Sequence, residues 1–340
     1  MTTNTPPTAA CLISLEPLRP KQTHAGYNDS AYHELFGTLA VRAELPFTRQ
    51  QFFTEGRQFV KGMSISGVQQ KLSLTIDKGS LTYTAQGGQF ILKPSPEIFP
   101  NAAENEHAAM TLARSMGFDT ALCGLVRFNG SSELAYITRR YDRSSTGPKH
   151  QESLLSAAGL HSDKKYDISY EQAAREVASV ANGRKALVLE FIRRVMFCYY
   201  IGNSDAHAMN FSFMRPTEAG STDADIQLSP IYDVLFTHAF PAEGNLSALA
   251  LDLLDDGNGG EFFTPQFERL GFYSLTDFIE LGRRVGIPAK PIIKFAEQII
   301  TGLPLHTALV ERSHIPDGMK KTVCALLADR AKALSPRLAV

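Results

Sequence analysis

Cysteine is scarce in this chain of 340 residues. The four cysteines, Cys11, Cys123, Cys198 and Cys324, lie far apart in the sequence. Disulfide frameworks and zinc knuckles need more cysteines at closer spacings, so both are excluded. Cys123 and Cys198 lie in apolar stretches, and we expect them to be small buried hydrophobic residues.

Net charge is nearly absent as well. Lys and Arg number 34 against 35 Asp and Glu, a formal charge of −1. This balance predicts no bulk attraction to nucleic acid or anionic membranes, although a local basic patch stays open. Hydrophobic residues make up 44% of the chain, which excludes a disordered protein. The length predicts two domains or one large bilobal domain.

Long hydrophobic runs are also missing. The longest helix-like apolar stretch, 187–201, is interrupted by Glu190, Arg193 and Arg194. It is too short and too charged to span a bilayer. Residues 1–20 lack the basic start and apolar centre of a secretory signal. We therefore expect a cytoplasmic protein that does not interact with membranes.

The first half of the chain is typical of antiparallel sheet. Alternation of apolar and polar residues, interrupted by turn residues, predicts strands at 71–77, 81–84, 89–93, 121–128 and 133–138. One helix is expected between them, over 101–117. Asn101 and Glu104 have the spacing of a helix N-cap and its capping partner, and Gly117 is expected to end the helix.

The second half is mainly helical. Helices are expected over 171–181, over 186–201 and from about 265 to the end, and short strands over 211–214 and 225–229. The change of character near 139–145 indicates a hinge. We predict an α+β protein with a β-rich lobe over 1–140 and an α-helical lobe over 141–340.

A polar loop after the buried helix carries the most informative residues. Asp205 precedes Asn210 by five positions, and Asp233 follows Asn210 by 23, after the second short strand. Phosphoryl transfer from ATP needs a carboxylate that orients the attacking hydroxyl, and a carboxylate with an amide to hold Mg²⁺. Protein kinases use the same Asp-to-Asn spacing. A hairpin between the strands would bring Asp233 beside Asn210.

Simpler readings of these residues exist. Asp205 and Asn210 could cap turns after a helix, and Asp233 could be an ordinary turn residue. His207 could approach a phosphate or only orient the loop. The joint placement of the three residues around a hairpin favours the metal site.

The N-terminal lobe would then supply a phosphate loop and a lysine. Residues 61–71 precede the first strand and contain two glycines, which permit close approach of backbone N–H groups to phosphates. Lys93 ends an apolar strand, where an ammonium needs a negative partner. Phosphate could provide it, as could the acidic helix start at Glu104 to Glu106; a surface lysine is the alternative.

With these residues placed, the chain resembles the HipA family of bacterial toxin kinases, and most closely its short HipT-type members. The resemblance covers about 60–235 and is weaker over the last hundred residues. The matching stretches are SISGVQQKLSL (64–74), FILKPSP (90–96), ENEHAAMTLARSMGF (104–118), RRYDR (139–143), HQE (150–152), GNSDAHAMNFS (202–212) and PIYDV (230–234).

The resemblance implies a bilobal protein-kinase-like fold and Mg-ATP-dependent phosphorylation of serine or threonine on a protein. It implies Asp205 as catalytic base and Asn210 and Asp233 as Mg²⁺ ligands. The implied ATP-binding residues are Ser66, Gly67, Val68, Gln69, Gln70, Lys71, Lys93, Arg139, Arg140, Tyr141, His207, Asn210, Tyr232 and Asp233. Autophosphorylation is expected on Ser64 and Ser66.

The resemblance also implies a place in a type II toxin-antitoxin system. The phosphate loop lies only about 60 residues from the start, so we expect most of the extra N-terminal subdomain of full-length HipA to be missing. A small HipS-like antitoxin would supply that piece, and a helix-turn-helix HipB-like antitoxin would bind DNA. The implied substrate is an aminoacyl-tRNA synthetase, with the tryptophanyl enzyme expected for the short form.

Two other classes of protein stay open at this stage. A catalytically silent kinase-like binding module would show no Mg²⁺-dependent ATP binding. A small-molecule or lipid kinase of related fold would label no protein. The Asp-Phe-Gly and Ala-Pro-Glu sequences of eukaryotic kinases are absent, so their activation-loop regulation is not expected.

Overall fold

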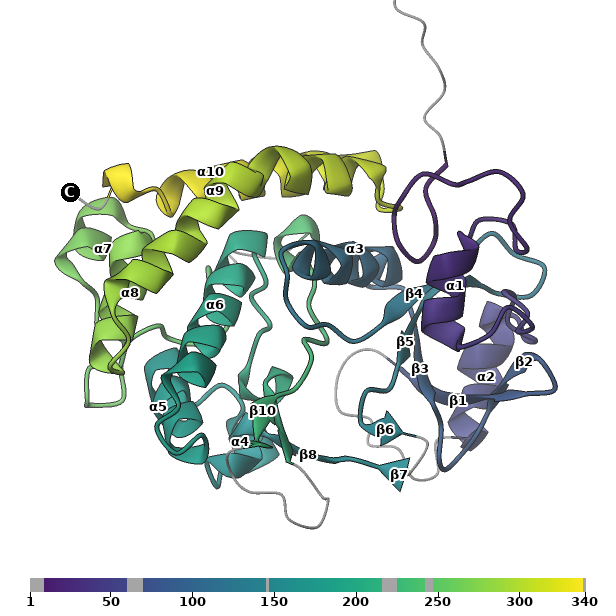
Figure 1. The fold of residues 1–340 in the computed structure, drawn as a ribbon, viewed down its shortest axis with the longest axis horizontal. Helices are drawn as coiled ribbons and strands as arrows, with labels where there is room; N and C mark the ends of the chain where they lie inside the picture. Colours follow the sequence, from purple (N-terminus) through teal and green to yellow (C-terminus); the bar gives the residue numbers. More distant parts are fainter. Residues whose placement is uncertain (1–8, 60–69, 145–146, 216–224, 242–246, 339–340) are drawn as a thin grey trace, which may run out of the picture. The chain divides into compact units, whose positions relative to one another are not determined.

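The computed structural model describes residues 9–59, 70–144, 147–215, 225–241 and 247–338. The chain forms two compact units (Figure 1). The first unit contains Met1–Arg143 and Leu309–Asp317, and the second contains Ser144–Ala308 and Gly318–Val340. That Leu309–Asp317 belongs with the N-terminal unit could not be expected from the sequence, because this segment lies far along the chain.

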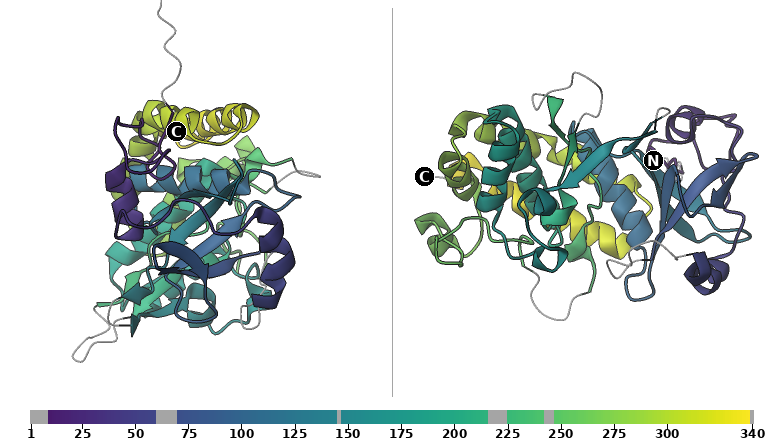
Figure 2. Two further views of the ribbon diagram at one scale, coloured as in Figure 1. Left: turned by 90° about the vertical axis from the view of Figure 1, so that its right-hand side faces the viewer. Right: turned by 90° about the horizontal axis from the view of Figure 1, so that it is seen from below.

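The first unit is built on a five-stranded antiparallel sheet (Figures 1 and 2). The strand order is β2-β1-β3-β5-β4. The bounds are β1 Leu72–Asp77, β2 Ser80–Tyr83, β3 Phe90–Pro94, β4 Cys123–Arg127 and β5 Leu134–Arg139. All five expected strands are therefore present. In the register of the two central strands, Lys93 of β3 lies opposite Tyr136 of β5.

The helices of the first unit, over its described residues, are α1 (Asp29–Phe36), α2 (Arg49–Phe59) and α3 (Ala102–Ser115). The sequence patterns missed α1 and α2. Helix α3 packs against β3, β4 and β5. It begins directly after Asn101, as expected, but Asn101 has a left-handed backbone (φ 62°) and its side chain makes no capping hydrogen bond. The Ser95 hydroxyl takes that role by accepting the Ala103 N–H at 3.0 Å.

The second unit contains a three-stranded sheet of order β10-β9-β8 and most of the helices. Strand β8 was missed by the sequence patterns, which detected only the other two strands of this sheet, β9 and β10. The bounds of the remaining elements are β6 Arg143–Ser144, β7 Gly147–Pro148, β8 His150–Ser153, α4 Leu154–Ala157, η1 Ser162–Lys164, α5 Tyr170–Val180, α6 Lys185–Ile201, η2 Ala208–Asn210, β9 Ser212–Arg215, β10 Gln227–Leu228, η4 Thr237–Ala239, α7 Pro265–Leu270, α8 Leu275–Arg284, α9 Ala289–Arg312, α10 Asp317–Ala333 and η5 Pro336–Leu338.

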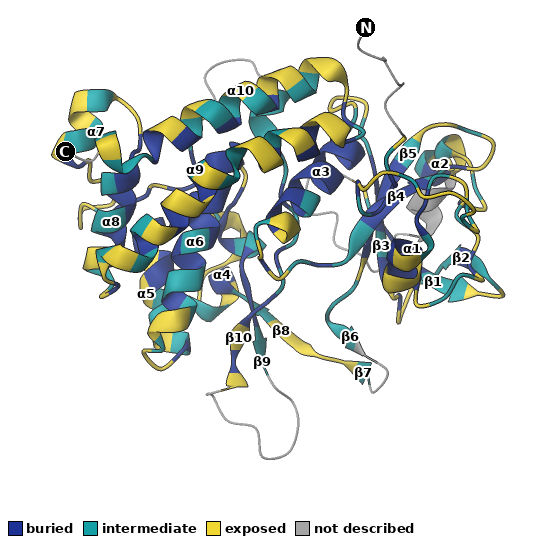
Figure 3. Ribbon diagram, turned by 45° about the horizontal axis from the view of Figure 1, so that its top comes forward, coloured by how far each residue is buried: buried dark blue, intermediate teal, exposed yellow. Residues whose placement is uncertain are grey.

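Helix α6 forms the centre of the second core. Nearly all of its residues from Phe191 to Ile201 are buried, as the dark blue ribbon in Figure 3 shows. It ends at Gly202, whose left-handed backbone (φ 65°) favours glycine. A Cβ at this position would also overlap the Leu326 side chain. The chain therefore leaves the core at a fixed point and enters the polar loop.

Among the residues that the structure describes, no helix is both long and apolar enough to cross a membrane.

Candidate active site

The loop after α6 is held by its own hydrogen bonds. The Asn203 N–H donates to the Cys198 carbonyl at 2.8 Å, which closes the last turn of the helix. The buried Asn203 side chain then accepts the Asp205 N–H at 3.1 Å. Asp205 itself is exposed. The loop thus supports a carboxylate that a solvent-borne reactant can reach.

The expected pair of Asp205 and Asn210 is brought together in this loop. The Asn210 Nδ2 donates to the Asp205 carbonyl at 2.9 Å, and the His207 N–H donates to the same carbonyl at 2.8 Å. Because its nitrogen faces a carbonyl, the Asn210 amide presents its oxygen on the other side. Among the described residues, that oxygen has no hydrogen-bond partner. Asn210 is therefore oriented as an oxygen ligand.

Two side chains attach the segment around Asp233 to the same loop. Before Asp233, the Tyr232 hydroxyl donates to the Met209 carbonyl at 2.8 Å. After it, the Thr237 hydroxyl donates to the Gly202 carbonyl at 2.6 Å and accepts the Ser204 N–H at 2.8 Å. The hairpin of β9 and β10 connects the two segments. Asp233, which has a left-handed backbone (φ 59°), is thus carried alongside the loop.

The Tyr232 hydroxyl belongs to a small, partly buried network. It lies 2.6 Å from the Ser212 hydroxyl, which in turn accepts the Gln151 amide at 3.0 Å. Burial raises the pKa of Tyr232 to about 12, so the phenol remains a hydrogen-bond donor. The network joins β8, β9 and the segment that carries Asp233.

The His207 imidazole interacts electrostatically with the carboxylates of Asp205 and Asp233. Burial lowers the pKa of its imidazole, and the Asp205 and Asp233 charges oppose this effect, while Lys165 adds to it. The side chain is buried and its ring meets the Tyr166 ring edge-on at 5.2 Å. The net lowering favours a neutral imidazole. The burial of His207 and its contact with Tyr166 favour a role in orienting the loop.

The first unit holds the expected lysine in an ion pair. The Lys93 Nζ lies 2.7 Å from Glu106 Oε1, and the two side chains are 11% and 0% exposed. The ammonium also lies 5.5 Å from the centre of the Tyr136 ring. Glu106 of α3 is thus the negative partner that the strand position required. Glu104 instead bonds to Ser95 and Asn101.

The remaining predicted residues of this unit are only partly described. Gln70 is exposed and Lys71 half-buried. The Arg140 guanidinium forms two hydrogen bonds with the Asp142 carboxylate, at 2.9 and 2.6 Å, while Arg139 is exposed and Tyr141 half-buried. The other members of the phosphate loop lie outside the described residues: Ser64, Ser66, Gly67, Val68 and Gln69.

Sequence reasoning missed several residues that shape the loop. The Tyr166 hydroxyl donates to Asp205 Oδ1 at 2.6 Å, and the Tyr170 hydroxyl donates to the Ala206 carbonyl at 2.8 Å. Thr237, which bonds to Gly202 and Ser204, was also missed. These contacts join segments 30 or more positions apart, and no local sequence pattern marks them.

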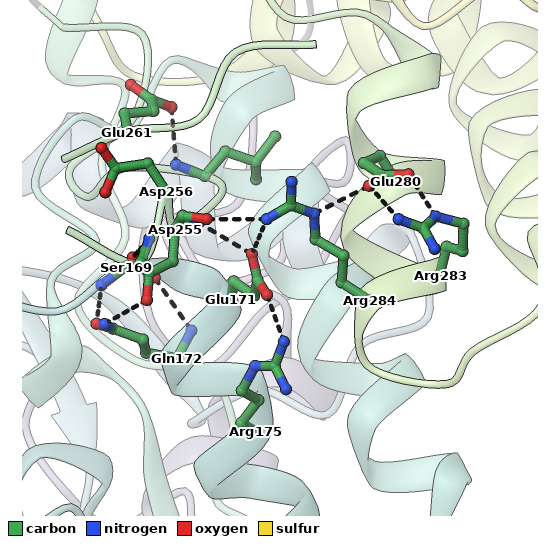
Figure 4. A network of polar contacts seen from close by, with 12 residues as sticks. Ser169, Glu171, Gln172, Arg175, Asp255, Asp256, Glu261, Glu280, Arg283 and Arg284 are labelled. Carbon is green, nitrogen blue, oxygen red and sulfur yellow. Dashed lines mark hydrogen bonds and ion pairs between the residues drawn. The ribbon is translucent and has the colours of Figure 1, made fainter. Parts of the chain in front are cut away.

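A network of charged residues fixes the start of helix α5, which carries Tyr170 (Figure 4). The buried Glu171 carboxylate binds Arg175 at 2.6 Å and Arg284 at 2.9 Å, and accepts the Asp255 N–H at 3.0 Å. Burial opposes ionisation of Glu171, but these donors outweigh it and lower the pKa. The Tyr170 N–H donates to the Asp252 carbonyl at 2.8 Å, in the segment that also contains Asp255. The network therefore holds α5 and its tyrosine in place.

Replacement of Thr237 with valine should destabilise the second unit. The Ser204 N–H would lose its partner, and the Gly202 carbonyl would keep only the longer bond from the His238 N–H at 3.3 Å. We expect a cost of about 1–3 kcal/mol in the free energy of unfolding. Urea denaturation measures the change. Thr237→Ser keeps the hydroxyl and should remain close to the wild type, and equal losses in both variants would contradict this role.

The oxygen ligands present here suit a hard cation such as Mg²⁺. Over the described part of the chain, no group of three His, Cys, Asp or Glu side chains is arranged to hold a metal ion. The arrangement instead offers the Asp233 carboxylate and the Asn210 amide oxygen, which accepts no hydrogen bond from any residue that the structure describes. Mg²⁺ is usually held by one or two carboxylates together with substrate phosphates, so this donor set fits it.

The two units have the fold of kinase-like proteins. The HipA chain in a Shewanella oneidensis complex of HipA, HipB and operator DNA matches with a TM-score of 0.64 at 18% identity, over 80% of this chain and 65% of that one. The Helicobacter pylori proinflammatory kinase CtkA matches with a TM-score of 0.52 at 16% identity, over 81% and 91%. At such identities the likeness concerns the fold alone.

Sequence comparisons identify the family. The HipA-like C-terminal domain matches residues 63–305, and the chain belongs to this family. A Haemophilus influenzae protein named "Putative kinase" is 36% identical over 296 residues, which are 84% of this chain and 85% of that protein. "Putative kinase Y4dM" of Sinorhizobium fredii is 35% identical over 209 residues, and the match spans half of its length. The expected family and fold class are confirmed.

Proposed function

We propose that this protein is a kinase of the HipA type, which transfers the γ-phosphoryl group of ATP to a serine or threonine hydroxyl of a protein. The observation that carries the proposal is the arrangement around the loop after α6. There Asp205 and Asn210 share one hydrogen-bonded turn, and Tyr232 and Thr237 attach the Asp233 segment to it. Membership of the HipA-like family and the kinase names of the relatives support the same activity.

Each residue has a separate role in this proposal. The Asp205 carboxylate accepts the hydrogen bond of the attacking hydroxyl and orients it. Asn210 and Asp233 hold Mg²⁺, which, when bound, neutralises phosphate charge. In the first unit, Lys93 binds ATP phosphates while Glu106 fixes its position. Nucleotide contacts are also proposed for residues 66–71, for 139–141, and for His207 and Tyr232.

The biological role that we propose is that of a toxin in a toxin-antitoxin system, in the short HipT-type form. The Shewanella structure contains HipA with HipB and operator DNA, which supports a HipB-like antitoxin as partner and contact with DNA through it. A HipS-like antitoxin and an aminoacyl-tRNA synthetase substrate, probed first as the tryptophanyl enzyme, follow from the family resemblance. The proposed location is the cytoplasm.

Incubation with γ-labelled ATP tests the activity directly. We expect Mg²⁺-dependent labelling of the protein itself, and loss of labelling when EDTA removes the cation. Mass spectrometry should find the phosphate on Ser64 or Ser66, and the variant with both serines changed to alanine should lose it. Absence of any transfer in the presence of Mg²⁺, to the protein itself or to added tryptophanyl-tRNA synthetase, would contradict the proposed function.

A further inference from the structure

The Asp205 side chain has an unexpected partner within the second unit. The Tyr166 hydroxyl donates to Oδ1 of the carboxylate at 2.6 Å. Among the described residues no hydrogen bond reaches the other oxygen, Oδ2. The two oxygens of the exposed carboxylate therefore differ, since one is held by the protein and the other is open to a reactant.

The segment that carries Tyr166 is itself held against the loop. The Ala208 N–H donates to the Lys165 carbonyl at 3.2 Å, which attaches the backbone. The Tyr166 ring meets the His207 ring edge-on at 5.2 Å, and the Lys165 ammonium lies 4.8 Å from the Tyr166 ring centre. Side-chain and backbone contacts together fix the direction of the phenol, although nearly half of the tyrosine is exposed (47%).

The phenol also remains protonated. Partial burial raises the pKa of Tyr166 above its ordinary value, and the bond to Asp205 raises it further. The hydroxyl therefore donates to the carboxylate throughout the neutral pH range. A hydrogen bond from a neutral donor to an ionised acceptor is stronger than one between neutral groups.

We propose that Tyr166 is a positioning residue for phosphoryl transfer, which holds Oδ1 of Asp205 so that Oδ2 faces the substrate hydroxyl. This inference rests on the proposed function. A carboxylate on an exposed loop otherwise rotates freely about χ2 and samples many directions. Fixing one oxygen restricts the other to the geometry of attack, and small losses of such geometry cost large factors in rate.

Substitution of Tyr166 with phenylalanine tests this role. The variant keeps the ring contacts with His207 and Lys165 and loses only the hydroxyl. We expect kcat for transfer from Mg-ATP to fall about 10-fold with the KM for ATP unchanged within about twofold. In the Asp205→Asn background, the same substitution should produce no further loss, because the two side chains act as one unit.

Lys164→Ala provides a matched control in the same segment. It removes the exposed ion pair with Asp167 at 2.7 Å. In the described part of the chain the Lys164 side chain forms no hydrogen bond or ion pair with Asp205 or its loop, so kcat should stay at the wild-type value. A kcat of Tyr166→Phe equal to or above that of the wild type would overturn the positioning role. So would a further 10-fold fall in kcat when Tyr166→Phe is added to Asp205→Asn. If the wild type transfers no phosphoryl group at all, the proposed function itself fails.

Discussion

The Asp205→Asn variant should lose phosphoryl transfer by a factor of at least about 10², since a well-placed general base contributes that much. Asparagine has the same size and retains an oxygen that can accept the Tyr166 hydroxyl, so the loop should keep its shape. The ligands proposed for Mg²⁺, Asn210 and Asp233, are unaltered. Calorimetry should therefore find the affinity for Mg-ATP close to that of the wild type while labelling from γ-labelled ATP is lost.

Asp167→Asn is the matched control for this experiment. Asp167 is an exposed carboxylate on the neighbouring segment, with 54% of its side chain accessible, and within the described ranges its carboxylate pairs only with Lys164. Its neutralisation should leave the rate of phosphoryl transfer unchanged.

Asp233→Asn should differ from both Asp205→Asn and Asp167→Asn, because loss of a metal ligand lowers Mg²⁺-dependent ATP binding as well as transfer. A rate above one tenth of wild type in Asp205→Asn would refute its role as the base.

The Lys93→Met variant should lower the stability of the first unit by about 3–5 kcal/mol, the usual cost of leaving one member of a buried ion pair without its partner. The Glu106 carboxylate is fully buried and would remain charged in an apolar site, or take up a proton at a cost. Urea denaturation followed by circular dichroism measures the change. The double variant Lys93→Met with Glu106→Gln should recover part of the loss, because no charge is then left behind.

An exposed ion pair gives the control for the lysine. Lys332 and Asp329 of α10 lie 3.2 Å apart, and their side chains are 76% and 75% exposed. Lys332→Met should cost no more than about 1 kcal/mol. Equal losses in the free energy of unfolding for Lys93→Met and Lys332→Met would contradict the stabilising role assigned to the buried Lys93–Glu106 pair.

Prediction of the regular elements succeeded where local signals were strong. The alternating residues of 71–77 and the apolar run of 186–201 each bury a face, and both elements are present as β1 and α6. Helices α1 and α2 were missed because they are short, 8 and 11 residues, and short segments carry a weak periodic signal. Asn101 holds the predicted N-cap position of α3, but its side chain does not cap the helix, since Ser95, from the end of the preceding strand, supplies the oxygen instead.

Within the candidate site, the sequence alone was enough to join Asp205 with Asn210, because five positions in a tight loop leave the chain little freedom. It also indicated that Asp233 would follow a hairpin, since two short strands with a polar link pair readily. Only the tertiary structure decided which side chains hold this arrangement. Tyr166, Tyr232 and Thr237 act through hydrogen bonds between segments distant in the chain, and such bonds depend on packing, which no local periodicity encodes.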